Sequence, residues 1–196
     1  SYMDKESEVS CDDAVGEGNW TEADGSSAQF TIEHDSCHLI EYYAIDNVDK
    51  TEAVNKQCIF VDNEPPETDK LIGEPKFECD DETGKCGEES EWQAWFVTNH
   101  TDITLSCNDV EPHPVGHENL CFKISWHPID GPSGYITQEY AGETKLESEN
   151  DYYCVPTEEG RYTFNFKEDS LHNLEWYCKD ALGNQNEAQI EWDNVD

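Results

Sequence analysis

Apolar and polar residues alternate in short runs along this chain, and the runs predict β-strands separated by turns. Residues 102–107 and 120–126 are the clearest cases, because every second side chain in them is apolar. No stretch has the three-to-four-residue spacing of an amphipathic helix. About seven to nine such runs follow residue 64, which is typical of two packed sheets. The predicted fold class is therefore an all-β sandwich.

One phrase occurs twice. Residues 30–46 and 164–180 align without gaps at a shift of 134 residues, and seven of the seventeen positions are identical. A repeat at a fixed period indicates tandem units of one architecture. We therefore predict a partial module in residues 1–63, made of the C-terminal strands of a unit, and a complete module in residues 64–196. The identical pairs are Phe30/Phe164, Asp35/Asp169, Ser36/Ser170, His38/His172, Glu41/Glu175, Tyr43/Tyr177 and Asp46/Asp180.

Each copy of the phrase predicts a hairpin. In the first copy, residues 28–32 alternate like a strand, and residues 39–45 and 57–61 form two antiparallel strands around a turn. Cys37 and Cys58 are equidistant from the centre of that turn, so we expect them opposite one another and within disulfide reach. Their counterparts in the second copy, Leu171 and Trp192, are expected to be an apolar pair in contact.

Charge narrows the choice of partners. The chain has 46 acidic and 11 basic residues and a formal net charge of −35. Nucleic acid is excluded, because its phosphates would be repelled, and an anionic membrane surface is disfavoured. Six Trp, nine Tyr and seven Phe supply the core that disordered acidic chains lack. High salt or abundant divalent cations would each favour such an acidic surface.

Several features predict an exported chain. Nine cysteines against one methionine indicate an oxidising compartment. Asn19 and Asn99 each begin a glycosylation sequon. No apolar run approaches the roughly 20 residues of a membrane span, and no signal peptide precedes Ser1. We expect a mature or excised piece of a longer extracellular protein.

The sequence contains few motifs that indicate catalysis or metal binding. None of the catalytic motifs that can be recognised by spacing is present, so no enzyme is predicted. Cys79 and Cys86 bracket an acidic loop and predict a small local disulfide, with a zinc half-site as the alternative. Calcium is the one cofactor that we expect, because carboxylates and amides cluster at the hairpin turns and module ends. The candidate ligands are Asp46, Asn47, Asp49, Asp62, Asn63, Glu64, Asp109, Glu111, Asp180 and Asn184, and the alternative is that these residues only form turns.

The phrase IEYYAIDNVDK…VDNEPPET, followed by KLIGEPKF and WFVTNHTDITLSC, resembles the tandem immunoglobulin-like repeats of prokaryotic, especially archaeal, surface proteins. In such repeats a similar phrase closes one unit and "GEPK" opens the next. The resemblance covers about half the chain and implies immunoglobulin-like sandwich modules of stalks, adhesins or filaments. It carries no catalytic residue.

Numbering the second module as an immunoglobulin-like sandwich implies its disulfides. Cys107 and Cys178 then fall on the second and the penultimate strand, where the inter-sheet bridge of such domains lies. Cys121 is left to pair with Cys154, and the other two pairings of these four cysteines stay open. Cys11 aligns with Cys154, whose partner belongs to the front half of a unit. We therefore expect Cys11 to pair outside the chain or to stay unpaired.

The function that follows is a non-catalytic structural module of an extracellular stalk or filament. A partial sandwich leaves edges and apolar faces uncovered, which a strand of a neighbouring subunit or repeat could complete. Copies of the same protein or its neighbouring repeats are the expected partners. The alternative is an adhesin that binds glycans or another cell surface through Trp92, Trp95 and Tyr135.

Overall fold

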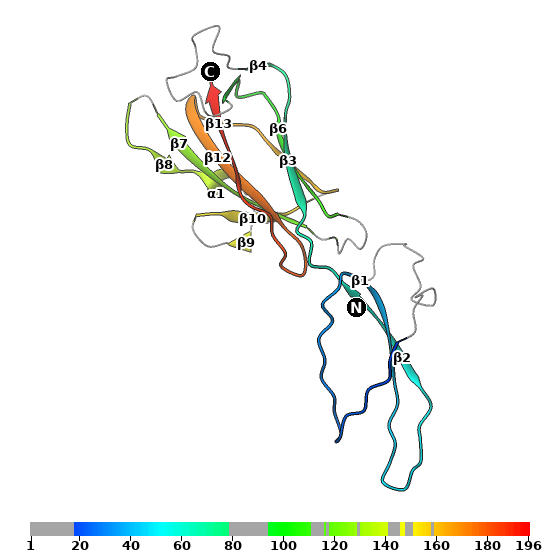
Figure 1. Ribbon diagram of the computed structural model, residues 1–196. Helices are drawn as coiled ribbons and strands as arrows, with labels where there is room; N and C mark the ends of the chain where they lie inside the picture. The colour runs from blue at the N-terminus through cyan, green and yellow to red at the C-terminus, as the bar shows by residue number, and fades with distance from the viewer. Residues whose placement is uncertain are drawn as a thin grey trace. The chain divides into compact units, whose positions relative to one another are not determined.

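The structure is a computed structural model that describes residues 18–78, 94–110, 116, 118–128, 130–140, 146–147, 151–157 and 159–196. The chain divides into two compact units, the first ending at Asn63 and the second beginning at Glu64 (Figure 1). None of the described helices is long and apolar enough to cross a membrane.

The regular structure in the described part of the first unit is one hairpin. Strands β1 (Ser36–Tyr42) and β2 (Asn55–Val61) pair antiparallel and form a two-stranded sheet. The strand expected at residues 28–32 is wrong, because that segment has no regular structure. Its counterpart in the second unit overlaps β11 (Arg161–Phe164), which pairs with a neighbouring strand, β6 (Ile103–Asn108). The described part of the first unit has no strand equivalent to β6, so residues 28–32 have no ladder to join.

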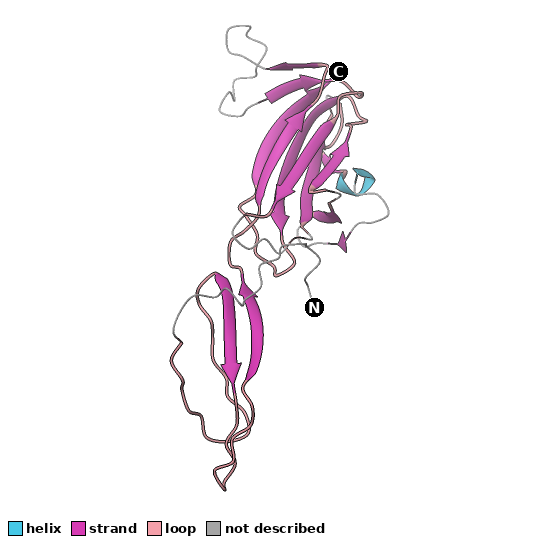
Figure 2. Ribbon diagram, turned by 90° about the vertical axis from the view of Figure 1, so that its right-hand side faces the viewer, coloured by secondary structure: helices cyan, strands magenta, loops and turns pink. Residues whose placement is uncertain are grey.

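The second unit is an all-β sandwich, which confirms the predicted fold class. An eight-stranded sheet in the order β4-β5-β13-β12-β7-β10-β9, with β8 beside β7, packs on a three-stranded sheet in the order β11-β6-β3 (Figures 1 and 2). A strand expected over residues 135–140 is wrong in its second half, which forms the short helix α1 (Thr137–Tyr140). The remaining strands are β3 (Glu67–Ile72), β4 (Lys76–Glu78), β5 (Ala94–Val97), β7 (Asn119–His127), β8 (Gly134–Tyr135), β9 (Leu146–Glu147), β10 (Tyr153–Pro156), β12 (Ser170–Lys179) and β13 (Gln189–Val195).

The core lies between these two sheets. Alternation along each strand sends every second side chain inward, as Ile103 and Leu105 on β6 illustrate with no exposed surface. The rings of Phe122 and Phe164 stack with centroids 5.8 Å apart across the two sheets. The other fully buried apolar side chains of β7, β10 and β12 are Leu120, Ile124, Val155 and Leu174.

Two disulfides tie the sandwich together, and both had been predicted. Cys107 on β6 bonds Cys178 on β12 and so joins the two sheets, with Cα atoms 5.7 Å apart. Cys121 on β7 bonds Cys154, which lies directly opposite it on β10. The first bridge closes a loop of 71 residues, which contributes on the order of 4 kcal/mol in the chain-entropy model. Bonds of this kind are typical of a non-reducing environment.

A buried ion triad also joins the two sheets. Lys70 lies opposite Leu105 in the β3–β6 ladder and therefore points into the core. Its Nζ lies 2.6 Å from Glu191 Oε1 and 2.6 Å from Asp193 Oδ2 on β13. Only 4% of the Lys70 side chain and none of the Asp193 side chain is exposed. Burial raises the pKa of Asp193 to about 6, although Lys70 acts to lower it.

The substitution Lys70→Met is expected to lower the free energy of unfolding of the second unit by about 3–5 kcal/mol, because it leaves the buried Asp193 and the half-buried Glu191 without their cation. Guanidinium denaturation measures this. Replacing Glu191 and Asp193 by Leu in the same variant should restore most of the loss. Lys179→Met, at an exposed lysine of the same unit, is the control and should change stability by less than about 0.5 kcal/mol. A Lys70→Met variant as stable as the wild type would contradict the triad's role.

Candidate functional site

Most hydrogen bonds of the first hairpin's turn recur in the second unit. The Asp46 N–H donates to the Lys50 carbonyl at 2.9 Å, and the Asp180 N–H donates to the Asn184 carbonyl at 3.0 Å. The two Asp carboxylates accept equivalent backbone amides: Asp46 accepts the Lys50 N–H at 2.9 Å, and Asp180 accepts the Asn184 N–H at 2.8 Å. Two further backbone hydrogen bonds correspond. The Asp49 N–H donates to the Asp46 carbonyl, as the Gly183 N–H donates to the Asp180 carbonyl. The Glu52 N–H donates to the Ala44 carbonyl, as the Asn186 N–H donates to the Cys178 carbonyl.

The two hairpins also share one register. Ser36 lies opposite Val61, just as Ser170 lies opposite Val195 in the second hairpin. These bonds all lie within one hairpin, between residues no more than eight positions apart. The repeat seen in the sequence is thus a structural repeat of β12–β13 by β1–β2.

The expected cross-strand pairs are wrong in this register. Cys37 lies opposite Phe60 and Cys58 opposite Leu39, because the ladder is centred one residue later than the turn midpoint that we assumed. The Sγ atoms of the two cysteines are nevertheless only 3.6 Å apart, and neither of these cysteines is a free thiol. Their pairing stays a prediction. In the second hairpin the same offset places Leu171 opposite Asn194 and Trp192 opposite Asn173.

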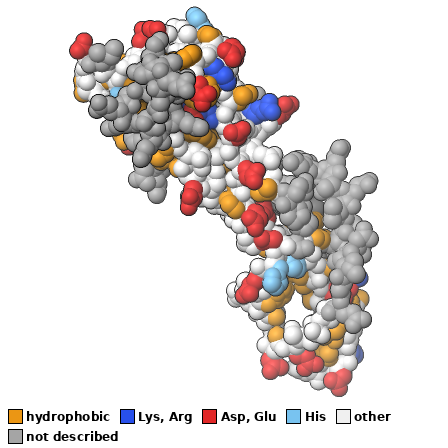
Figure 3. Space-filling view, turned by 45° about the horizontal axis from the view of Figure 1, so that its top comes forward, with side chains coloured by type: hydrophobic (Ala, Val, Ile, Leu, Met, Phe, Trp, Pro, Cys, Tyr) orange, Lys and Arg blue, Asp and Glu red, His pale blue; other side chains and the backbone are white. Residues whose placement is uncertain are grey.

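Equivalent positions in the two hairpins, and in the segments just before them, differ sharply in exposure. Phe30 is 62% exposed, whereas the identical Phe164 is 8% exposed. Tyr42 is 51% exposed, whereas its counterpart Trp176 is 5% exposed. Figure 3 shows apolar side chains of the first unit at the surface beside acidic ones. The other core-facing positions His38, Ile40, Ala44, Ile59 and Val61 are exposed or half-buried, whereas His172, Leu174, Cys178, Asp193 and Val195 are all buried.

The edges of the two hairpins differ in the same way. In the second unit β12 is flanked by β7, and β13 is flanked by the parallel strand β5. In the described part of the chain no further strand pairs with β1 or β2. A sheet edge with unpaired N–H and C=O groups is a template for another strand. We therefore take the β1–β2 hairpin, with its core-facing positions, as the candidate functional site and name it the open hairpin.

The predicted calcium ligands are divided among separate turns. Asp46 binds the amides of its own turn, and Asn47 and Asp49 are exposed in that turn. At the end of the first unit, Asp62 is buried, and Asn63 donates its side-chain amide to Asp35. Glu64 begins the second unit and is exposed.

Asp109 and Asp180 are the predicted ligands that the second unit brings together. Both are buried, and a carboxylate oxygen of each lies within 4.8 Å of the other. Asp109 accepts the Gly116 amide at 3.2 Å, and Asp180 accepts the side-chain amide of Asn184 at 2.7 Å. Backbone and amide donors thus already bind these oxygens, which is what turn-forming Asp residues do without an ion. Calcium binding stays a prediction.

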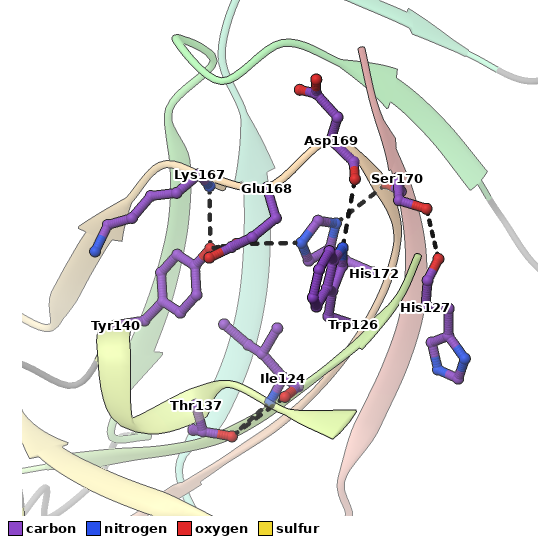
Figure 4. Close-up of polar contacts among 10 residues, drawn as sticks. All are labelled: Ile124, Trp126, His127, Thr137, Tyr140, Lys167, Glu168, Asp169, Ser170 and His172. Atoms are coloured by element: carbon purple, nitrogen blue, oxygen red, sulfur yellow. Dashed lines mark hydrogen bonds and ion pairs between the residues drawn. The ribbon is translucent and has the colours of Figure 1, made fainter. Parts of the chain in front are cut away.

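A buried polar cluster surrounds the start of β12 (Figure 4). His172 is fully buried, stacks on Phe166 at 4.4 Å, and points Nε2 at Glu168 Oε2 over 3.5 Å. Tyr140 donates its hydroxyl to the same carboxylate and accepts the Lys167 amide at 3.0 Å. Burial lowers the pKa of His172, so the ring is neutral at pH 7. Packed rings and a fully buried histidine indicate a structural cluster that holds residues 165–170 against α1.

Of the aromatic residues expected to bind glycans, Tyr135 alone is both described and exposed, at 59%. Trp95 is half-buried: it packs against the core, with Lys76 Nζ 5.0 Å from its ring centroid, and its role as a glycan contact stays a prediction. Both predicted glycosylation asparagines, Asn19 and Asn99, are exposed. The predictions for Cys11, Cys79, Cys86, Glu111 and Trp92 fall outside the described residues.

No protein-family model matches the chain, and the curated proteins include none similar to it. Function therefore has to be argued from the two units themselves. Sequence reasoning located the open hairpin through the repeat. It missed the Lys70 triad, although a lysine alternating with Thr68 and Ile72 on one strand was a usable signal.

The matched pair Phe164→Ala and Phe30→Ala tests the difference in burial. Phe164→Ala is expected to lower the free energy of unfolding by about 3–5 kcal/mol, because it empties a packed core position. Phe30→Ala should change it by less than about 0.5 kcal/mol, because the ring already faces solvent. Thermal and guanidinium denaturation of the full chain measure both. A large loss for Phe30→Ala would mean that the open hairpin is covered within the chain.

Proposed function

We propose that this chain is a non-catalytic structural module of an extracellular stalk or filament, in which the open hairpin is completed by strands of another unit. One observation carries the proposal: at the repeat position shared by Tyr42 of β1 and Trp176 of β12, the ring is 51% exposed in one unit and 5% exposed in the other. Burying such a ring is worth about 1.5–3 kcal/mol, so the open hairpin gains stability from any strand pair that covers it.

The second unit shows how strands can cover such a hairpin. It covers the equivalent hairpin with β7 along one edge, β5 along the other, and the β11-β6-β3 sheet across the core-facing side. A neighbouring copy or repeat that offers the same strands would extend both ladders of the open hairpin. Strand addition of this kind combines main-chain hydrogen bonds with pockets for alternate side chains.

Three further observations support an extracellular, immunoglobulin-like identity. The disulfides Cys107–Cys178 and Cys121–Cys154 require a non-reducing compartment to persist. The first of them links the second strand of one sheet to the penultimate strand of the other, as in immunoglobulin domains. The closing and opening phrases resemble those of archaeal surface repeats. We propose membership of that group on these grounds, with a surface location.

Hydroxyl-radical footprinting tests whether strands of another unit cover the open hairpin. We compare the purified chain with the same protein in its native extracellular material. Phe30 and Tyr42 are expected to be labelled strongly in the purified chain and weakly in the native material, because the complementing strands then cover them. Their counterparts Phe164 and Trp176 should be protected in both samples and act as internal controls. Equal labelling of Phe30 and Tyr42 in the two samples would contradict the proposal.

An adhesin is the second candidate, and one observation favours it. The outer face of the eight-stranded sheet carries an aromatic and charged patch, in which Lys123 Nζ lies 4.7 Å from the ring centroid of Tyr152 and 5.8 Å from that of Tyr135. Tyr152 donates to Glu175 at 2.7 Å, and Glu175 pairs with Lys123 at 2.9 Å. A glycan-array signal that is lost in Tyr135→Ala and kept in Phe77→Ala, at another exposed ring, would favour this function. A signal unchanged in Tyr135→Ala, or none at all, would count against it.

A further inference from the structure

The two hairpins have the same fold, yet they present different chemistry at the positions that contact the front half of a sandwich. Front half here means the strands from β3 to β10, residues 64–157. In the second hairpin Glu191 and Asp193 bind the buried Lys70 of β3. In the open hairpin the equivalent positions, 134 residues earlier, are Gln57 and Ile59. A lysine at the Lys70 position would therefore find no carboxylate there.

A second contact differs in the same sense. Cys178 of the second hairpin bonds Cys107 of β6 and so fastens the front half to its own hairpin. Ala44 is its counterpart in the open hairpin. A cysteine at the Cys107 position would gain no bond there. A methyl group also leaves room for a larger apolar side chain across the core.

A third contact is already satisfied within the open hairpin. Glu175 pairs with Lys123 of β7 at 2.9 Å. Its counterpart Glu41 instead pairs with Lys56 of β2, directly opposite it, at 2.8 Å. A strand in the place of β7 thus needs no lysine. All three differences indicate that the partner of the open hairpin lacks the lysine and cysteine contacts by which this chain's own front half binds β12–β13.

From these differences we infer that the open hairpin binds the front half of another unit of the same fold, one that carries an apolar residue in place of Lys70 and no cysteine in place of Cys107. Lys70 and Cys107 conversely keep this chain's own front half on β12–β13 and off the open hairpin. A buried ammonium that faces Gln57 and Ile59 has lost its counter-ions, which makes the mismatched pairing costly. The unpaired Lys70 ammonium thus disfavours binding of this chain's own front half to the open hairpin, so the specificity comes from a contact that penalises the wrong partner. The inference rests on the proposed function and specifies its partner.

Two probes that differ at one position test the inference. Each is a polypeptide of residues 64–157 with Cys107→Val, and one of them also carries Lys70→Ile. The competence of the lysine probe is established by its binding to a peptide of residues 158–196, its own hairpin. Each probe is then titrated into the full chain, in which the Cys107–Cys178 bond holds the resident front half in place. Fluorescence anisotropy of the labelled probe gives the dissociation constant.

The Lys70→Ile probe is expected to bind the full chain about 100-fold more tightly than the lysine probe, as the loss of a buried ion pair implies. A full chain with Gln57→Glu and Ile59→Asp should reverse the preference, because it restores both carboxylates. Equal binding of the two probes to the wild-type chain would overturn the inference and leave completion itself intact. Binding of neither probe to either chain would overturn the proposed function as well.

Discussion

A hairpin with an apolar face has to be covered, and this requirement organises both units of the chain. The two hairpins share most of their turn hydrogen bonds and their register, so the local sequence directs both to the same geometry. What separates them is whether side chains on the core-facing side are shielded from water. Leu174 has no exposed surface, whereas its counterpart Ile40 remains half-buried. The open hairpin is thus a preformed acceptor, which lowers the entropy cost of binding a partner.

The second unit shows what covering such a hairpin requires. The Cys107–Cys178 bond and the Lys70 triad both run from the smaller sheet to the hairpin side of the larger one. Buried ion pairs add little net stability over apolar packing, yet they penalise mismatched neighbours strongly. Their value here lies in specificity, because an array of similar sandwiches can exchange strands between units. An acidic surface with a net charge of −35 further disfavours unspecific association of copies.

Much of this architecture could be read from the sequence, because alternation and the internal repeat are local signals. They located the sandwich, the two hairpins and, with the immunoglobulin-like resemblance, the Cys107–Cys178 and Cys121–Cys154 bonds. The ladder register was missed because it depends on how residues 45–55 turn, which symmetry about the turn does not determine. The strand at residues 28–32 was overpredicted because alternation reports a tendency, and a strand also needs a neighbour. The triad depends on contacts between residues more than 120 positions apart, such as Lys70 and Glu191, which one sequence does not reveal.

Backbone hydrogen exchange measured residue by residue in the purified chain tests the central claim most directly. We predict that the amides of β12 and β13 exchange only through global unfolding of the second unit. Those of β1 and β2 should exchange orders of magnitude faster, because no strand among the described residues pairs with their outer edges. Protection of β1 and β2 equal to that of β12 and β13 in the monomeric chain would contradict the account, since it would mean that the first hairpin is already covered.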